Sequence, residues 1–413
     1  MAEPRSSDIH QAAAAMLLEL LRRTHLSAPD ALATAVAEEA RAIGARDVVM
    51  YVVDYEQKTL VPVPAPDASG RGPLSVHGTI AGRSFISTSI VDVEIPEGRR
   101  LWLPLMDGTE RLGVMEMTFG GASSGVPADI MAVAERYSHA VAMLIVTKSA
   151  YSDHFTSLRR RQPMTMASEL LWELVPPLVF ATDDLVVAGL MEPAYDMGGD
   201  ALDYALNEGV LHVAVFDAMG HGLPAAGMSA FALSAYRHSR RTGHGLAETY
   251  TAIDAVVASQ QQTTRFVTAV IATLDVGSGR LQWISAGHPA PLVVRRGRVV
   301  KTLDVPPSPP MGLQLGGAGP VVGQEVLEPG DLLLFFTDGL TEARRPGGEL
   351  FSVERLGEFI ERQAAAGLPA PETLRRMREA IIERREGALR DDASAVLVEW
   401  RRGSERKLVP QTV

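Results

Sequence analysis

The chain has 413 residues, of which 46% are hydrophobic, and it contains no cysteine. This length suffices for a sizeable core in two or three domains, and the lack of thiols excludes disulfides, cysteine nucleophiles and cysteine-based metal sites, so any metal must be held by oxygen or imidazole. The net charge of -11 argues against a broad binding surface for nucleic acid or an acidic membrane, because proteins bind these partners through an excess of Lys and Arg. With no basic leader and no apolar run approaching about 18 residues, we expect a soluble, cytoplasmic protein.

The N-terminal part of the sequence predicts a helix followed by a small α+β domain. An N-terminal segment, 1–25, contains a stretch of high helix propensity at 8–23 that ends in two arginines, as suits a helix C-terminus. The domain itself is placed at 26–126. Its predicted elements are a helix over 28–45, two strands within 47–63, a short helix and strand over 78–95, and a hairpin over 99–119.

The periodicity changes at Pro127. From there apolar residues recur at spacings of three and four, which predicts one long amphipathic helix over 127–161. We assign 127–175 as a connector that transmits a signal between the two halves. We also expect the chain to form a homodimer along this helix or along 8–23. The alternative is a helix that packs only on its own domain.

The C-terminal half, 176–402, is rich in apolar strands, and its predicted helices come in pairs. They follow Gly222, at 224–241 and 245–261, and recur at 352–366 and 371–386. Strands joined by turns, with paired helices, indicate antiparallel sheet layers covered by helices. Residues 403–413 are predicted to be a loose tail.

Several strands of this half end or begin at acidic residues beside glycine or another small residue. They are Asp217 in VAVFDAMGHG, Asp338 in LLLFFTDG, Asp391 and Asp392 in RDDASAVLVEW, and Asp200 and Asp203 in DMGGDALDY. A carboxylate at the end of a core strand is costly unless something pairs with it. No matching set of Lys or Arg accompanies these residues in the sequence, so the predicted partner is a metal ion.

Oxygen ligands without cysteine indicate Mg²⁺ or Mn²⁺. Taken singly, an Asp-Gly pair after a strand is usually a turn, and Gly-His-Gly is weak evidence. Four acidic strand ends in one domain instead indicate a site. Because hard cations held by carboxylates bind phosphate and activate water, the predicted reaction is metal-assisted phosphoester hydrolysis.

These motifs also carry a family resemblance. In the order GGDALDY, FDAMGHGLPAA, SAGHPAPL, LEPGDLLLFFTDGLTEAR and RDDASAVLV, they resemble the SpoIIE/RsbU-type serine phosphatases, a bacterial branch of the PPM metal-dependent protein phosphatases. GTIAGRSF and LWLPLMDGTERLGVMEM resemble a GAF sensor domain, with a PAS-like fold as the alternative. The implied fold class is α+β: an α-β-β-α sandwich of antiparallel sheets, preceded by a GAF-like α+β sensor domain and the long connector helix.

The resemblance implies two Mn²⁺ or Mg²⁺ ions between the sheets, at one end of the sandwich. The metal-site residues carried over by motif are Asp217 bridging the ions, the carbonyl of Ala218, Asp338 and Asp391 on the first ion, and Asp200 ordering water or contacting the second. Asp392 is the alternative to Asp391.

A bridging hydroxide would attack phosphorus directly, with Asp217, His221 and Asp338 as the catalytic residues. His221 would be the general acid for the leaving serine oxygen, or alternatively a structural residue of its turn. His288 is predicted to shape a turn.

The implied function is a serine/threonine phosphatase, gated by the sensor domain, that acts on a small regulatory protein such as a phosphorylated anti-sigma-factor antagonist. No nucleic-acid or membrane partner is expected. The sensor domain could take a small-molecule ligand, although not a thiol-linked tetrapyrrole. The alternative is a signal-binding regulatory scaffold whose phosphatase domain is silent or conditionally assembled; the retained set of carboxylates favours the enzyme.

Overall fold

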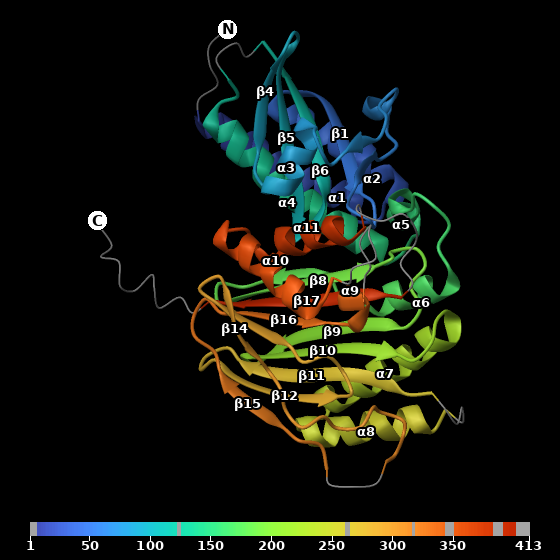
Figure 1. Ribbon diagram of the computed structural model, residues 1–413. Coiled ribbons are helices and arrows are strands. Elements are labelled where there is room, and N and C mark those ends of the chain that lie inside the picture. Colours follow the sequence, from blue (N-terminus) through green and yellow to red (C-terminus); the bar gives the residue numbers. More distant parts are fainter. Residues whose placement is uncertain are drawn as a thin grey trace. The chain divides into compact units, whose positions relative to one another are not determined.

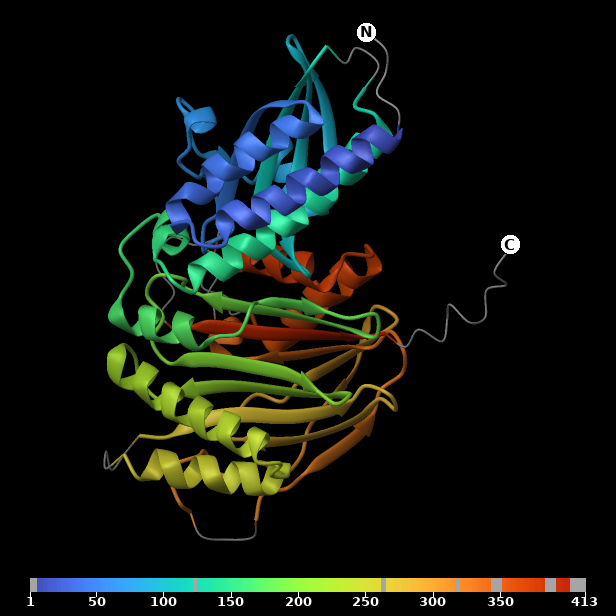
Figure 2. The same cartoon turned by 180° about the vertical axis from the view of Figure 1, so that it is seen from behind.

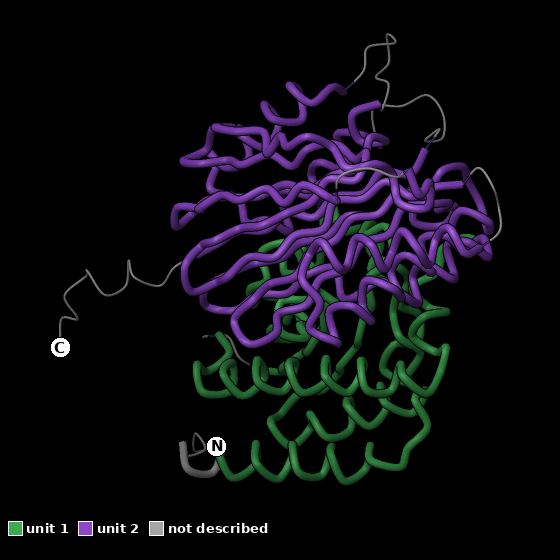
Figure 3. The backbone as a smooth tube through the Cα atoms, turned by 90° about the horizontal axis from the view of Figure 1, so that it is seen from below, with its two compact units in different colours: residues 1–162 green, residues 163–413 purple. Residues whose placement is uncertain are grey.

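The computed structural model describes residues 6–121, 125–260, 265–315, 319–342, 351–382 and 391–401. The predicted tail, 403–413, lies outside these ranges. The chain divides into two compact units, unit 1 at 1–162 and unit 2 at 163–413 (Figure 3).

Unit 1 is built on one antiparallel sheet with helices on both faces (Figures 1 and 2). Its six strands run in the order β3-β2-β1-β6-β5-β4. Its main elements are α1 (Ser6–Thr24), α2 (Leu32–Glu39), β1 (Ala45–Val53), β2 (Thr59–Pro62), β3 (Leu74–Ser75), α3 (Ile80–Ser87), β4 (Val91–Ile95), β5 (Gly98–Asp107), β6 (Glu110–Gly120), α4 (Ala128–Ser149) and α5 (His154–Arg159).

Two apolar clusters explain why the central strands of unit 1 are apolar on both sides. On one face Met50 of β1 and Met115 of β6 pack with α1, α2 and α4. On the other face Tyr51 and Val114 pack with Phe85 of α3. Alternate residues of one strand therefore enter different cores, as the two-residue period of a strand requires.

The prediction of one helix over 127–161 is wrong. Helix α4 ends at Ser149, α5 spans only His154–Arg159, and a further helix, α6 (Met166–Leu174), belongs to unit 2. The apolar period of α4 is that of a helix that packs on its own sheet, with Tyr137 and Val141 fully buried. The alternative, a helix that packs on its own domain, describes α4.

Among the described helices, α4 alone is long and apolar enough to cross a membrane by length and composition. Its apolar residues do not form one continuous run, because Glu135, Arg136 and Ser138 interrupt them. Buried core helices pass the same test, and one face of α4 lies in the core of unit 1.

Unit 2 is a sandwich of two antiparallel sheets covered by helix pairs, as predicted. One sheet has five strands in the order β15-β12-β11-β10-β9, and the other has six in the order β14-β13-β16-β17-β8-β7. Besides α6, the elements are β7 (Val179–Ala181), β8 (Leu185–Glu192), β9 (Asp200–Asn207), β10 (Val210–Ala218), α7 (Leu223–Arg241), α8 (Leu246–Ala258), β11 (Val267–Asp275), β12 (Arg280–Ala286), β13 (Leu292–Arg295), β14 (Arg298–Thr302), β15 (Gly323–Val326), β16 (Leu332–Phe336), α9 (Asp338–Glu342), α10 (Val353–Ala365), α11 (Ala370–Ile382) and β17 (Ala393–Trp400).

The two sheets of unit 2 share one core. Phe216 of the five-stranded sheet and Phe335 of the six-stranded sheet lie in the same buried cluster, which extends to α7 and α8. A second cluster joins the opposite face of the six-stranded sheet to α10 and α11, through Phe336 and Ile360 among others. The result is an α-β-β-α sandwich (Figure 1).

Candidate active site

The acidic strand ends meet at one end of the sandwich. In the five-stranded sheet, Asp217 at the end of β10 is the register partner of Asp200 at the start of β9. In the six-stranded sheet, Asp338 follows the end of β16, and Asp391 and Asp392 precede β17, its antiparallel neighbour. Antiparallel pairing therefore brings segments far apart in the sequence to the same edge.

Asp392 joins the two sheets at this edge. Its Oδ2 accepts hydrogen bonds from the backbone N–H groups of Gly198 at 2.6 Å, Gly199 at 2.5 Å and Asp200 at 3.2 Å. The Asp392 side chain is buried, whereas Asp391 is exposed. Asp392 thus holds the turn at Gly198 and Gly199, whereas the Asp391 carboxylate is accessible to solvent and to a ligand.

Glycine is required where these segments touch. A Cβ on Gly199 would lie 2.6 Å from the carbonyl oxygen of Ala218, and one on Gly339 would lie 1.7 Å from that of Asp392. Ser229 of α7 also donates a hydrogen bond to the Gly199 carbonyl. The glycines beside the carboxylates therefore permit close backbone approach, in addition to any turn they form.

The carboxylates perturb one another. Burial, followed by the charges of Asp338, Asp391 and Asp392, raises the pKa of Asp217 to about 7. Burial and the charges of Asp217 and Asp392 also raise the pKa of Asp200 well above its usual range. These shifts place the carboxylates within electrostatic reach of one another.

The donor set fits a hard divalent cation. Carboxylate oxygens and a backbone carbonyl are the ligands that Mg²⁺ and Mn²⁺ prefer, and crowded carboxylates leave negative charge for a cation to offset. Within the described ranges, no three His, Asp or Glu side chains already enclose one ion position. The edge therefore has the right chemistry for a cation, without a closed cage of side chains.

Asp203 is not part of this set, and the expectation that no Lys or Arg accompanies the acidic segments is wrong for it. Its buried carboxylate pairs with Arg237 at 2.7 Å and Arg240 at 2.6 Å, both from α7. Asp203 thereby anchors α7 to β9. Because both arginines lie more than thirty residues further along the chain, no local pattern reveals the pair.

His221 lies next to the acidic segments. It is exposed in the loop between β10 and α7, and a Cβ on Gly198 would lie 3.1 Å from its Cα. Its role stays a prediction. His288 is buried, with Nδ1 2.9 Å from the hydroxyl of Thr268, the register partner of Asp217.

Sequence reasoning missed the hydroxyl groups that support the carboxylates. Thr337 donates a hydrogen bond to Oδ2 of Asp200 at 2.7 Å. The hydroxyl of Thr268 lies 3.5 Å from the carbonyl oxygen of Asp217. The only local signal was that Thr337 stands next to Asp338 in the TDG motif.

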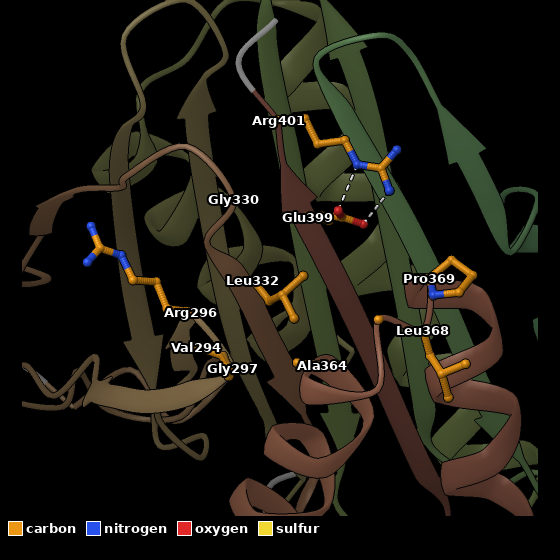
Figure 4. Close-up of a pocket in the computed structure, with 11 residues that line it drawn as sticks. Val294, Arg296, Gly297, Gly330, Leu332, Ala364, Leu368, Pro369, Glu399 and Arg401 are labelled. Carbon is orange, nitrogen blue, oxygen red and sulfur yellow. Dashed lines mark hydrogen bonds and ion pairs between the residues drawn. The ribbon is translucent and has the colours of Figure 1, made fainter. Parts of the chain in front are cut away.

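A pocket of about 260 Å³ lies elsewhere in unit 2 (Figure 4). Leu332, at the start of β16, and Glu399, near the end of β17, contribute to it. Asp338 and Asp391 lie at the opposite ends of these strands. The pocket, where Arg401 donates a hydrogen bond to Glu399 at 2.7 Å, is therefore separate from the acidic edge, which is the end of the sandwich that carries Asp200, Asp217, Asp338, Asp391 and Asp392.

Residues 207–401 match the family model of stage II sporulation protein E (SpoIIE). This matched part of unit 2 is of the SpoIIE/RsbU-type PPM phosphatase family. The phosphoserine phosphatase RsbU of Bacillus subtilis is 23% identical over 257 residues, which are 60% of this chain and 74% of RsbU. Protein IcfG of Synechocystis is 26% identical over 136 residues, 33% of this chain and 21% of IcfG.

Solved structures with similarity include the RsbU and RsbW domains of Rv1364c from Mycobacterium tuberculosis, at 27% identity, with 53% of this chain and 62% of that one covered and a TM-score of 0.46. The phosphatase domain of SpoIIE from Bacillus subtilis is 20% identical, with 53% and 65% covered and a TM-score of 0.44. The family-model match and the similarity to RsbU indicate a PPM-type serine/threonine protein phosphatase, a class that implies divalent metal ions.

We predict that His288 makes unfolding depend on pH. Burial lowers the pKa of His288 from 6.5 to about 4, and the backbone of Phe336, which raises the pKa, offsets this only in part. Among the described residues, Nε2 of His288 has no well-formed hydrogen bond. Below pH 6.5 the unfolded chain binds a proton here that the folded chain does not bind until about pH 4. This residue therefore removes up to about 3 kcal/mol of stability as the pH falls through that window.

Urea unfolding from pH 7 to 4 tests this. We expect His288→Gln to lose less stability than wild type over the window, and exposed His238→Gln to follow wild type. Equal slopes for all three proteins would contradict the prediction.

Proposed function

We propose that this phosphatase removes phosphate from a phosphoserine or phosphothreonine of a small regulatory protein, with two Mn²⁺ or Mg²⁺ ions at the acidic edge and with unit 1 as a GAF-like sensor that controls the rate. The observation that carries the proposal is the convergence of the acidic segments of both sheets on one edge, where burial and then the neighbouring carboxylates raise the pKa of Asp217 and Asp200. We place this activity in the cytoplasm, with no nucleic-acid or membrane partner.

In this proposal Asp217, Asp338, Asp391 and the Ala218 carbonyl hold the ions, and Asp200 lies toward the second. Exposed Asp391 is preferred over Asp392, whose Oδ2 already accepts three N–H groups. Bound ions would offset phosphate charge and activate water.

His221, exposed beside the Gly-Gly turn, donates a proton to the leaving serine oxygen. Asp392 keeps the two sheets in register during turnover.

The proposed substrate is a phosphorylated anti-sigma-factor antagonist. The match to RsbU, which is named a phosphoserine phosphatase and of which this chain covers 74%, supports a phosphoserine as the group removed. A silent scaffold is the alternative, and a metal-dependent assay separates the two.

Phosphate release from an aryl phosphate, with Mn²⁺, with Mg²⁺ and with chelator, tests the site. We expect metal-dependent turnover that falls by about 100-fold or more in Asp217→Asn and Asp338→Asn, because each removes a ligand charge. Asp183→Asn, in an exposed turn before β8, is the matched control and should retain the wild-type rate. Turnover retained in the two site variants would refute the assignment, and none in wild type would favour the scaffold.

Control by unit 1 is tested by comparing the full chain with residues 163–413. Unit 2 has its own buried clusters, so we expect it to fold alone. If unit 1 acts on the site with a coupling of about 1–3 kcal/mol, kcat/KM of the two proteins should differ by about 5-fold or more. Equal values for two folded proteins would argue against gating.

We further propose that a second copy of the chain covers an apolar stripe on unit 1. Helices α1 and α4 pack side by side (Figure 2), and they expose Leu18 and Leu21 of α1 and Met143 and Val146 of α4 at three-residue spacing. The same two helices also expose charges of both signs, with Glu19 paired to Arg22 on α1 and with Glu135 and Arg136 on α4. A second copy can match these charges, whereas an anionic membrane would favour excess basic residues.

Light scattering after size exclusion tests this surface. We expect a wild-type dimer and a monomer for the double variant Leu18→Asp with Met143→Asp, because each places charges in the apolar contact. Leu26→Asp changes a leucine that is 91% exposed beyond α1, and should leave the dimer intact. A wild-type monomer at all concentrations would exclude the proposal.

A further inference from the structure

One hydroxyl group links three of the four acidic segments. Thr337 lies between the last residue of β16 and Asp338, and it is fully buried. Its Oγ1 is 2.7 Å from Oδ2 of Asp200, and the backbone N–H of Ser394 donates to the same Oγ1 at 2.9 Å. Ser394 follows the Asp391–Asp392 pair by two residues.

The direction of these bonds follows from the donors available. The amide of Ser394 is a donor only, so it occupies a lone pair of the hydroxyl oxygen. The single hydroxyl proton is left for an acceptor, and Asp200 is closer than the Ser394 carbonyl, which lies at 3.5 Å. Thr337 therefore donates to Asp200 with a hydroxyl oriented by the neighbouring strand.

This bond crosses the sandwich. Thr337 and Ser394 belong to the six-stranded sheet side, and Asp200 begins β9 of the five-stranded sheet. The backbone N–H of Asp200 is itself held by Asp392 from the six-stranded side. The opposite sheet thus holds Asp200 at its backbone, through Asp392, and at its carboxylate, through Thr337.

We propose that Thr337 is a positioning residue of the metal site, which holds the Asp200 carboxylate in the orientation that cation binding uses. The inference rests on the proposed function for its ligand, a divalent cation. The backbone of Thr337 is bonded to β17 independently, since its N–H donates to the Ser394 carbonyl at 3.0 Å. A valine would fill the same buried space and keep this backbone bond, so the hydroxyl is the specific feature.

Calorimetric titration of the full chain with Mn²⁺, without substrate, tests the proposal. Partners that orient metal ligands typically contribute about 10–100-fold in affinity. We expect Thr337→Val to bind Mn²⁺ about tenfold more weakly and Thr337→Ser to stay close to wild type. Thr249→Val, at a buried threonine of α8, is the matched control and should bind as wild type does.

A double-mutant cycle separates positioning from general damage. If Thr337 acts through Asp200, Thr337→Val should have no further effect on Mn²⁺ affinity in an Asp200→Asn background. Thermal unfolding in chelator shows whether each variant folds, and Thr337→Ala replaces the valine variant if that one does not.

Unchanged Mn²⁺ affinity in Thr337→Val, a full loss in Thr337→Ser, or a loss that persists in the Asp200→Asn background would each overturn the proposal. So would a wild-type chain that binds no Mn²⁺. Mn²⁺ binding that depends on Thr337, in a protein without metal-dependent phosphate release, would support the positioning role and refute the proposed function.

Discussion

The acidic edge depends on one carboxylate that is fully occupied by backbone donors. A buried carboxylate is expensive unless hydrogen bonds satisfy it, and Asp392 accepts from three consecutive N–H groups of residues 198–200. These bonds join the segment before β17 to the turn before β9, so they set the spacing between the two sheets at this end. The other carboxylates can lie close together because the hydrogen bonds of Asp392 hold the two sheets together against the repulsion between these charges.

The close contact that Asp392 makes between the two sheets also explains why glycines lie beside the carboxylates. Backbone from two sheets can meet at this distance only if side chains are absent, and a Cβ at Gly199 or Gly339 would collide with a carbonyl oxygen. The Gly beside each Asp is therefore part of the packing between layers. In sequence, the same pairs look like ordinary turn signals, because a turn and a close approach both favour glycine.

The acidic segments could be predicted from sequence because each is a local pattern: an apolar strand that stops at an Asp beside a small residue. Antiparallel pairing then leaves few ways to place the segments, and the sandwich follows from strand and helix order. The different environments of Asp391 and Asp392 could not be predicted. The two residues are adjacent in the sequence, and only Asp392 accepts hydrogen bonds from residues 198–200 of the opposite sheet. The same limit applies to Asp203, whose arginine partners are on α7.

The error over 127–161 has a related cause. A period of three and four residues indicates that a helix has an apolar face, without indicating which surface covers it. In α4 that face meets the sheet of unit 1, while Met143 and Val146 remain exposed on another side. A helix apolar on two sides resembles a long coiled-coil connector in sequence, although α4 ends at Ser149 once its own sheet is covered.

Two threonines show how such a site is kept rigid. Thr268 lies across from Asp217 on β11 and contacts both the Asp217 carbonyl and His288, and Thr337 reaches Asp200 from the opposite sheet. Thr268 lies within β11 and Thr337 directly follows β16, and the β-branch of threonine restricts the χ1 rotamers of both side chains. A hydroxyl fixed in this way can direct a bond toward a carboxylate without adding charge to an edge that already carries several negative groups. That constraint favours threonine over lysine or arginine here, because a fixed cation would offset the negative charge on which binding of the proposed metal ions depends.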